Sequence, residues 1–155
     1  MAVPHVVFVD TSVILRLIGM DGIDQATNAA VEFDERRDQG QRLILTATAL
    51  IEAGNHIAQR SSGRRALAEQ LRKLIEAANT PDPPWILRET TLDQNFVDEL
   101  LNGNSTGSDL ITLLGDGRLG TGDVAILVER DQFKTKTAHA RVDVWTLDDE
   151  LASYS

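Results

Sequence analysis

The chain has 155 residues, of which 42% are hydrophobic and 25% are charged, and its net charge is -9. This length supports one hydrophobic core, so we expect a single domain over residues 1–155, and the absence of cysteine excludes disulfides, thiolate metal sites and cysteine nucleophiles. The apolar stretches fall short of the roughly 20 residues that cross a bilayer, and residues 1–9 do not resemble a signal peptide. We therefore expect a cytoplasmic protein with no membrane span.

The amino-terminal part of the chain is predicted to form a strand followed by two helices. Residues 6–9 are rich in β-branched side chains and favour a buried strand, which ends at Asp10. A short helix follows, since Asp10 and the hydroxyl residues after it provide good capping groups. Apolar residues at helical spacing predict a second, amphipathic helix over residues 24–39, which Gly40 closes.

The middle of the chain is predicted to form a strand and a helical hairpin. Residues 43–46 favour the strand, and the next helix is expected to begin with Thr48 as its cap and to carry Glu52 near its first turn. After a Ser-Ser-Gly break, residues 66–78 repeat the helical pattern until a proline-rich stretch ends it. The two helices are expected to pack as a hairpin.

The last part of the chain is predicted to add two strands and two helices. A short strand is expected over residues 85–89, a helix over 92–101 and a polar turn over 102–107. Thr121 is expected to cap the next helix, and a β-branched strand over 142–146 follows it. Strands that alternate with helices imply an α/β fold with a mostly parallel central sheet.

Four acidic residues are predicted to gather at one edge of this sheet. Asp10 and Asp148 each follow a strand, and the carboxyl ends of parallel strands share the edge at which open α/β sheets bind ligands. Glu52 and Asp123 are each expected in the first turn of a helix, where the positive helix terminus favours a carboxylate. Clustered carboxylates repel one another, so such a group implies a cation. Taken singly, each acid is better explained by a capping or solvent-exposed role, and the metal site is predicted from the four together.

Other charged residues leave alternatives open. Acids that compete for the fourth position or lie near it are Asp149, Glu150, Asp116, Asp131 and Asp143. The net charge of -9 opposes a nucleic-acid substrate unless a bound cation offsets part of it. Two basic clusters fit either phosphate contacts or solvated helix faces: Arg60, Arg64, Arg65, Arg72 and Lys73, then Lys134, Lys136 and Arg141. The histidines lack metal-ligand spacing and are interpreted as surface or packing residues: His5, His56 and His139.

Four segments resemble the motifs of PIN-domain ribonucleases in their order and approximate spacing. They are VFVDTSVIL over residues 7–15, ALIEA over 49–53, GDVAIL over 122–127 and VWTLD over 144–148. The resemblance covers nearly the whole chain and is closest to the small bacterial toxins of the VapC type. Each motif alone is weak, but the ordered set is fairly specific.

The resemblance implies a three-layer α/β/α domain that binds Mg²⁺ or Mn²⁺ and cleaves RNA with metal-activated water. The residues that it implies are Asp10, Glu52, Asp123 and Asp148 as metal ligands and catalytic acids, with Thr11, Ser12 and Thr146 in support. It further implies a homodimer and a small antitoxin protein as partners. The predicted hairpin from Thr48 to Ala78 is the candidate contact surface.

Other functions are weighed against this one. A phosphatase of the dehalogenase type needs a second aspartate two residues after Asp10, where this chain has Ser12. The glycine-rich turns at 115–117 and 120–122 lack the lysine of a phosphate-binding loop, and no nucleophile elbow supports a catalytic serine. A PIN-like nuclease of RNA processing outside a toxin system, and a non-catalytic PIN-like binding module, stay as alternatives; uptake of Mn²⁺ distinguishes the last from an enzyme.

Overall fold

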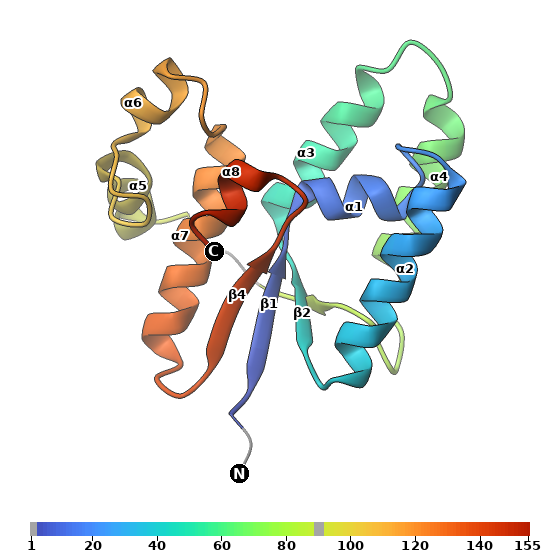
Figure 1. Ribbon diagram of the computed structural model, residues 1–155, viewed down its shortest axis with the longest axis horizontal. Helices are drawn as coiled ribbons and strands as arrows, with labels where there is room; N and C mark the ends of the chain where they lie inside the picture. The colour runs from blue at the N-terminus through green and yellow to red at the C-terminus, as the bar shows by residue number, and fades with distance from the viewer. Residues whose placement is uncertain (1–2, 89–91) are drawn as a thin grey trace.

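The computed structural model, which describes residues 3–88 and 92–155, has a four-stranded parallel sheet between two layers of helices (Figure 1). The strands are β1 (His5–Val9), β2 (Arg42–Leu45), β3 (Ile86–Leu87) and β4 (Arg141–Trp145), in the order β3-β2-β1-β4. Because all neighbouring strands are parallel, their carboxyl ends lie along one edge of the sheet, which we call the carboxyl edge. The opposite edge is the amino edge.

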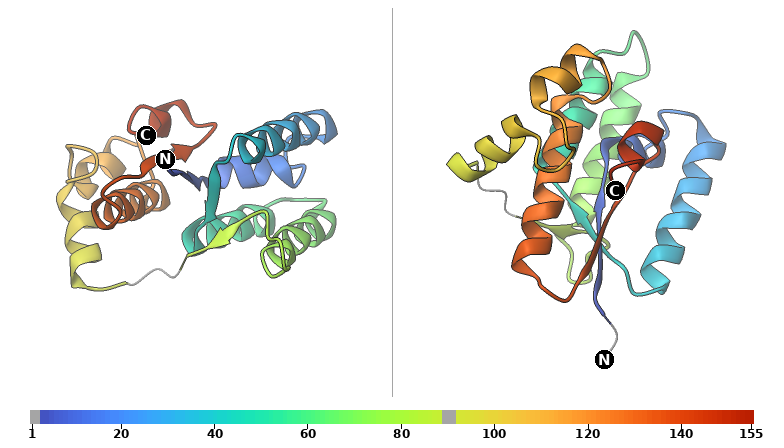
Figure 2. Two further views of the ribbon diagram at one scale, coloured as in Figure 1. Left: turned by 90° about the horizontal axis from the view of Figure 1, so that it is seen from below. Right: turned by 60° about the vertical axis from the view of Figure 1, so that its left-hand side comes forward.

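The two faces of the sheet are covered by different parts of the chain (Figure 2). Val7 and Val9 of β1 pack toward one face and Phe8 toward the other, as side chains alternate along a strand. The first face carries α1 (Thr11–Leu17), α2 (Ile23–Asp38), α3 (Ala47–Ala58) and α4 (Arg64–Ala77). The second carries α5 (Gln94–Asn102), α6 (Leu110–Gly115), α7 (Thr121–Lys136) and α8 (Asp149–Ala152). The expected α/β/α arrangement is confirmed.

The register of the sheet brings three chain segments together at the carboxyl edge. Val9, the last residue of β1, lies between the last residues of β2 and β4, which are Leu45 and Trp145. The backbone N–H of Asp10 donates to the carbonyl of Trp145 over 2.9 Å, which extends the β1–β4 pairing by one residue. Asp10 therefore lies beside the residues that follow β2 and β4.

Helix α3 begins earlier than its sequence predicts. Thr46, and not Thr48, is the N-cap, because the fully buried Thr46 has an extended backbone and its Oγ1 accepts the N–H of Ala49 over 3.2 Å. Glu52 consequently lies in the second turn of α3, whereas the sequence placed it near the first. One turn of helix carries Glu52 away from the strand end and toward α7.

Helix α7 also begins one residue earlier than expected. Gly120 is its N-cap and Thr121, the expected cap, is already helical. The side chain of Asp123 replaces the missing cap, since its Oδ2 accepts the backbone N–H of Gly120 over 3.0 Å. Asp123 thus does lie in the first turn of its helix.

Three further differences concern short elements. The third strand is confined to Ile86–Leu87, and residue 89 of the predicted strand lies outside the described residues. Helices α6 and α8 are not predicted at all, because six and four residues are too few to show a helical period. In the described part of the chain, no helix combines the length and apolar character needed to cross a membrane.

Candidate functional site

Asp10 is the best buried of the four predicted acids, with only 4% of its surface exposed. It caps α1, and its Oδ2 accepts hydrogen bonds from Oγ of Ser12 at 2.7 Å, Oγ1 of Thr146 at 2.8 Å and the backbone N–H of Ser12 at 3.3 Å. All of these donors are neutral. They hold the carboxylate in one orientation and leave its negative charge uncompensated.

Asp148 is tied to Asp10 through Thr146. The hydroxyl of Thr146 donates to Asp10 and accepts the backbone N–H of Asp148 over 3.0 Å. The side chain of Asp148 is exposed and caps α8, where its Oδ1 accepts the N–H groups of Glu150 and Leu151 at 2.9 and 3.3 Å. Among the adjacent acids, Asp148 is thus the one whose backbone is bonded to the Thr146 hydroxyl that anchors Asp10.

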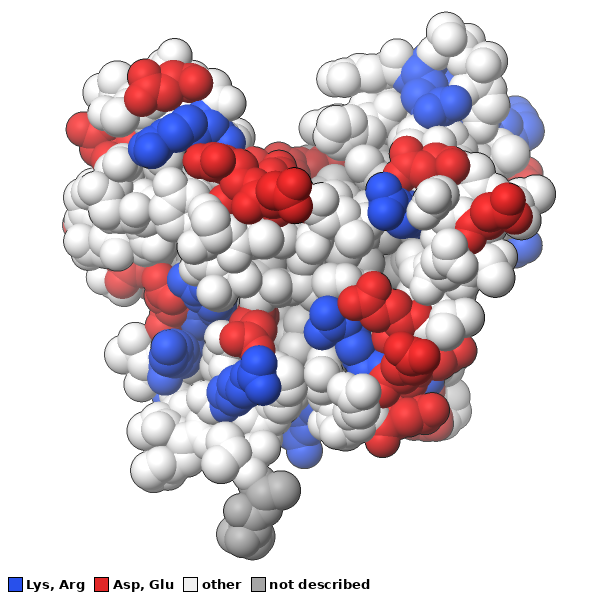
Figure 3. All heavy atoms as spheres, viewed as in Figure 1, with Lys and Arg blue, Asp and Glu red and all other residues white. Residues whose placement is uncertain are grey.

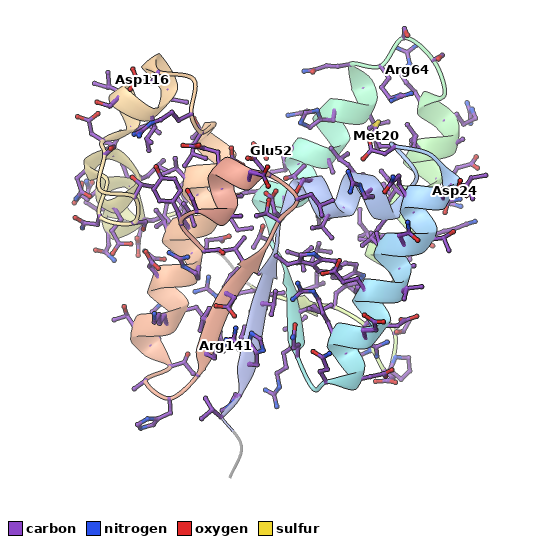
Figure 4. The ribbon with its side chains drawn as sticks, viewed as in Figure 1. Met20, Asp24, Glu52, Arg64, Asp116 and Arg141 are labelled. Carbon is purple, nitrogen blue, oxygen red and sulfur yellow. The ribbon has the colours of Figure 1, made fainter. Side chains whose placement is uncertain are left out.

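Glu52 reaches the same edge from α3. It is half-buried, and its Oε2 accepts the hydroxyl of Thr11 over 3.0 Å. On its other side lies Gly122 of α7, so close that a Cβ atom at Gly122 would stand 1.8 Å from Oε1 of Glu52. Figure 4 shows Glu52 pointing from α3 into the space above the ends of the strands.

Asp123 is half-buried beside the other three acids. The pKa of its carboxyl is raised from 3.8 to about 6, chiefly by burial and also by the negative charges of Asp10, Glu52 and Asp148, while the bond from Gly120 acts in the opposite direction. Asp123 is therefore near enough to interact electrostatically with each of the other three acids.

Two of the competing acids, Asp131 and Asp143, differ from the four in what balances their charge, whereas the ion pairs among the described residues do not include Asp116, Asp149 or Glu150. Asp131 contacts Arg130 at 2.8 Å, and Asp143 contacts both His5 and Arg141, at 2.8 and 2.9 Å. Asp116 lies at the far tip of α6 (Figure 4). By contrast, the ion pairs within residues 3–88 and 92–155 include none of the four acids at the carboxyl edge.

The four carboxylates are not arranged around one ion position in this structure. Among the described residues, no three acidic or histidine side chains converge closely enough to hold a metal ion in this conformation. The hydrogen bonds described above end on a single oxygen of each carboxylate: Oδ2 of Asp10, Oε2 of Glu52, Oδ2 of Asp123 and Oδ1 of Asp148.

The surface above the carboxyl edge is hollowed between two lobes, one built by α5 and α6 and the other by α3 and α4 (Figure 3). Acidic side chains lie at the base of the hollow, and basic side chains lie on both lobes. On the α3–α4 lobe, Arg64 stands at the outer tip (Figure 4), and on the other lobe Arg118 donates to Oγ of Ser108 over 3.0 Å. The hollow thus has acidic side chains at its base and scattered basic side chains on the lobes beside it.

Two residues that shape the site were missed in the sequence. Thr46 sets the start of α3 and hence the position of Glu52, but it was read as the last residue of a strand. Gly122 was read as part of a turn, although it lies inside α7. A glycine in a helix, directly before a candidate ligand, was the available signal for a close approach by another group.

No protein-family model matches the chain, and no curated protein matches it. The resemblance to PIN-domain ribonucleases therefore rests on the four sequence motifs and stays a prediction.

Proposed function

We propose that this chain is a divalent-metal-dependent ribonuclease of the PIN type, which hydrolyses RNA phosphodiester bonds at the carboxyl edge of its sheet. The observation that carries this proposal is the gathering of acids without cations: Asp123 interacts electrostatically with Asp10, Glu52 and Asp148, which come from three other segments, and within the described residues the hydrogen bonds given above link all four carboxylates to neutral partners. A group of this kind favours an external cation.

The donor set suits Mg²⁺ or Mn²⁺. Both ions prefer hard oxygen ligands, and each of the four side chains offers a carboxylate with one oxygen fixed by the protein. Hydroxyl and backbone donors that orient a ligand typically strengthen metal binding without joining it. Ser12, Thr11 and Thr146 supply such donors to Asp10 and Glu52.

The different burial of the four acids suggests a different role for each. Asp10 and Asp123, the buried and the half-buried aspartates, are assigned as the main metal ligands. Glu52 is assigned as a further ligand or as the group that orients water, since its carboxylate is held between two helices. The exposed Asp148 is assigned to a second ion. When bound, the metal supplies Lewis acidity to the phosphodiester and to the attacking water.

The hollow offers a route for the substrate. The basic side chains on the two lobes would attract the phosphate backbone of RNA, and the acids at the base of the hollow repel that backbone until a cation is bound. The net charge of -9 is compatible with this arrangement, because part of it is concentrated where a metal would lie. Binding of RNA should therefore depend on divalent metal as well as on ionic strength.

A role as the toxin of a toxin–antitoxin pair is the finer part of the proposal. The helices α3 and α4 form a groove of about 660 Å³ that is lined by apolar side chains such as Ile57, Leu71 and Ile75 and flanked by Arg64 and Arg65. An antitoxin segment with apolar and acidic residues fits this surface, and so does a second copy in a homodimer. The alternatives are a PIN-like nuclease of RNA processing and a non-catalytic PIN-like module.

The test is a cleavage assay on single-stranded and structured RNA with Mg²⁺ or Mn²⁺, with and without chelator. We expect cleavage by the native protein that chelator abolishes and added metal restores, and no cleavage by Asp10→Asn or Asp123→Asn. Chelator-resistant cleavage that survives in both variants would refute the mechanism. Growth arrest on expression of the native chain, but not of Asp10→Asn, would support the toxin role over RNA processing.

A further inference from the structure

Gly122 occupies a position at which a glycine is not needed by the backbone. It is the second residue of α7 and is not among the glycines with positive φ, so its conformation is open to any amino acid. Glycine also disfavours a helix relative to alanine. The reason for a glycine here must therefore lie in what surrounds it.

The neighbour that requires the glycine is the carboxylate of Glu52. A Cβ atom at Gly122 would lie 1.8 Å from Oε1, 2.2 Å from Cδ and 2.6 Å from Oε2 of Glu52. These three nearest contacts all involve the end of one flexible side chain, and none involves backbone. A larger residue at this position would consequently leave the fold intact and force the Glu52 carboxylate to move.

The opposite side of the same carboxylate is held by α1. Oγ1 of Thr11, a residue with 6% exposure, donates to Oε2 of Glu52 over 3.0 Å. The carboxylate is therefore enclosed between a buried hydroxyl and the bare Cα of a helix. The next residue after Gly122 is Asp123, whose pKa is raised in part by the charge of Glu52.

We propose that Gly122 is a positioning residue: its missing side chain lets the Glu52 carboxylate approach the first turn of α7, beside Asp123. This inference rests on the proposed metal-dependent function, since the position matters only if Glu52 and Asp123 act on one ion. The inference predicts that a substitution at Gly122 changes metal binding without lowering stability. Gly122→Ala should keep or raise the melting temperature and should weaken Mn²⁺ binding roughly tenfold, as displacement of an orienting contact does.

The matched control is Gly115→Ala. Gly115 is also helical, has no positive φ and has open space where a Cβ would stand, so this change should likewise keep or raise the melting temperature and should leave Mn²⁺ binding nearly unchanged. A second comparison uses Glu52→Asp, whose shorter side chain no longer reaches the added methyl group. In that background, Gly122→Ala should change Mn²⁺ affinity less than twofold.

The experiment combines calorimetry with Mn²⁺ and proton NMR of the metal-free protein. We expect nuclear Overhauser contacts between the γ protons of Glu52 and the α protons of Gly122 in the native protein, and weaker contacts from Glu52 to α7 in Gly122→Ala. Absence of these contacts in the native protein, or native Mn²⁺ affinity in Gly122→Ala, would overturn the inference. Failure of the native protein to bind Mn²⁺ would instead refute the proposed function, while the NMR contacts would still decide the position of Glu52.

Discussion

Asp143 and Asp10, two carboxylates on or beside the strand pair β1 and β4, have opposite kinds of neighbours. Asp143, in the middle of β4, contacts His5 and Arg141 of the amino edge, and its Oδ2 is within 3 Å of a nitrogen of each. At the carboxyl edge, Asp10 follows the neighbouring strand and is more deeply buried, and its hydrogen bonds within the described residues come from hydroxyl and backbone groups. The two edges are built on the same strand pair, β1 and β4.

This difference shows how a structural acid and a candidate ligand can be distinguished. A carboxylate beside cations of its own chain is already compensated, whereas one that is fixed by neutral donors keeps its charge for another partner. Burial alone does not separate the two kinds, since Glu52 and Asp143 are both half-buried. The charge of the neighbouring groups does separate structural acids from candidate ligands.

The largest expected effect is on catalysis. Asp10→Asn should lower the rate of metal-dependent RNA cleavage by about 100-fold or more, because it weakens several kcal/mol of charge stabilisation that a metal supplies. Asp143→Asn should leave the rate within about twofold of native, since this residue lies in the middle of β4 and is paired with His5 and Arg141. Initial rates on one labelled RNA measure both. Similar losses in the two variants would break the distinction between the two acids.

A smaller effect is expected from Thr146. Thr146→Val keeps the shape of the side chain but removes the hydroxyl that donates to Asp10 and accepts the N–H of Asp148. Mn²⁺ affinity, measured by calorimetry, should fall roughly tenfold. Thr135→Val is the control, because the hydroxyl of Thr135 bonds only to its own helix at the exposed carbonyl of Asp131. Equal losses from both changes would argue against an orienting role for Thr146.

The smallest effect is the pH dependence of stability that Asp123 introduces. Its pKa of about 6 in the fold lies above the ordinary 3.8, so ionisation opposes folding: the penalty is absent below about pH 4, grows toward pH 6 and is complete above it. Such a shift corresponds to about 3 kcal/mol, which solvent screening at this half-buried site reduces to about 1 kcal/mol.

Asp123→Asn removes this penalty and can retain an acceptor for the N–H of Gly120. The free energy of unfolding of the variant, relative to native, should therefore rise by about 1 kcal/mol between pH 4 and pH 8 in metal-free buffer. Denaturant titrations at both pH values measure it. A difference that stays constant with pH, or changes in the opposite direction, would contradict the origin given for the raised pKa.

Much of the fold follows from local patterns in the sequence. The β-branched runs before Asp10 and Thr146 are strands, and the parallel sheet follows from their alternation with helices. Short elements were missed because α6 and α8 are too brief for a periodic pattern. The cap of α3 was misplaced because Thr46 and Thr48 are both good capping residues, and only burial of Thr46 under the sheet edge decides between them.

The acids of the candidate site were named from the sequence, but the contacts that distinguish them were not accessible there. The bonds from Thr146 to Asp10 and from Thr11 to Glu52 join residues 136 and 41 positions apart. They depend on the β1–β4 register and on the packing of α1 against α3, which no local pattern encodes. The fit of Glu52 against Gly122 is likewise a tertiary contact.

The most direct test of the central claim is calorimetric titration of the metal-free protein with Mn²⁺ at pH 7.5. The account predicts saturable binding by the native chain and by Asp143→Asn, and its loss in an Asp10→Asn, Asp123→Asn double variant. No binding by the native chain, or binding that persists in the double variant, would contradict the claim that the carboxyl edge is a metal site.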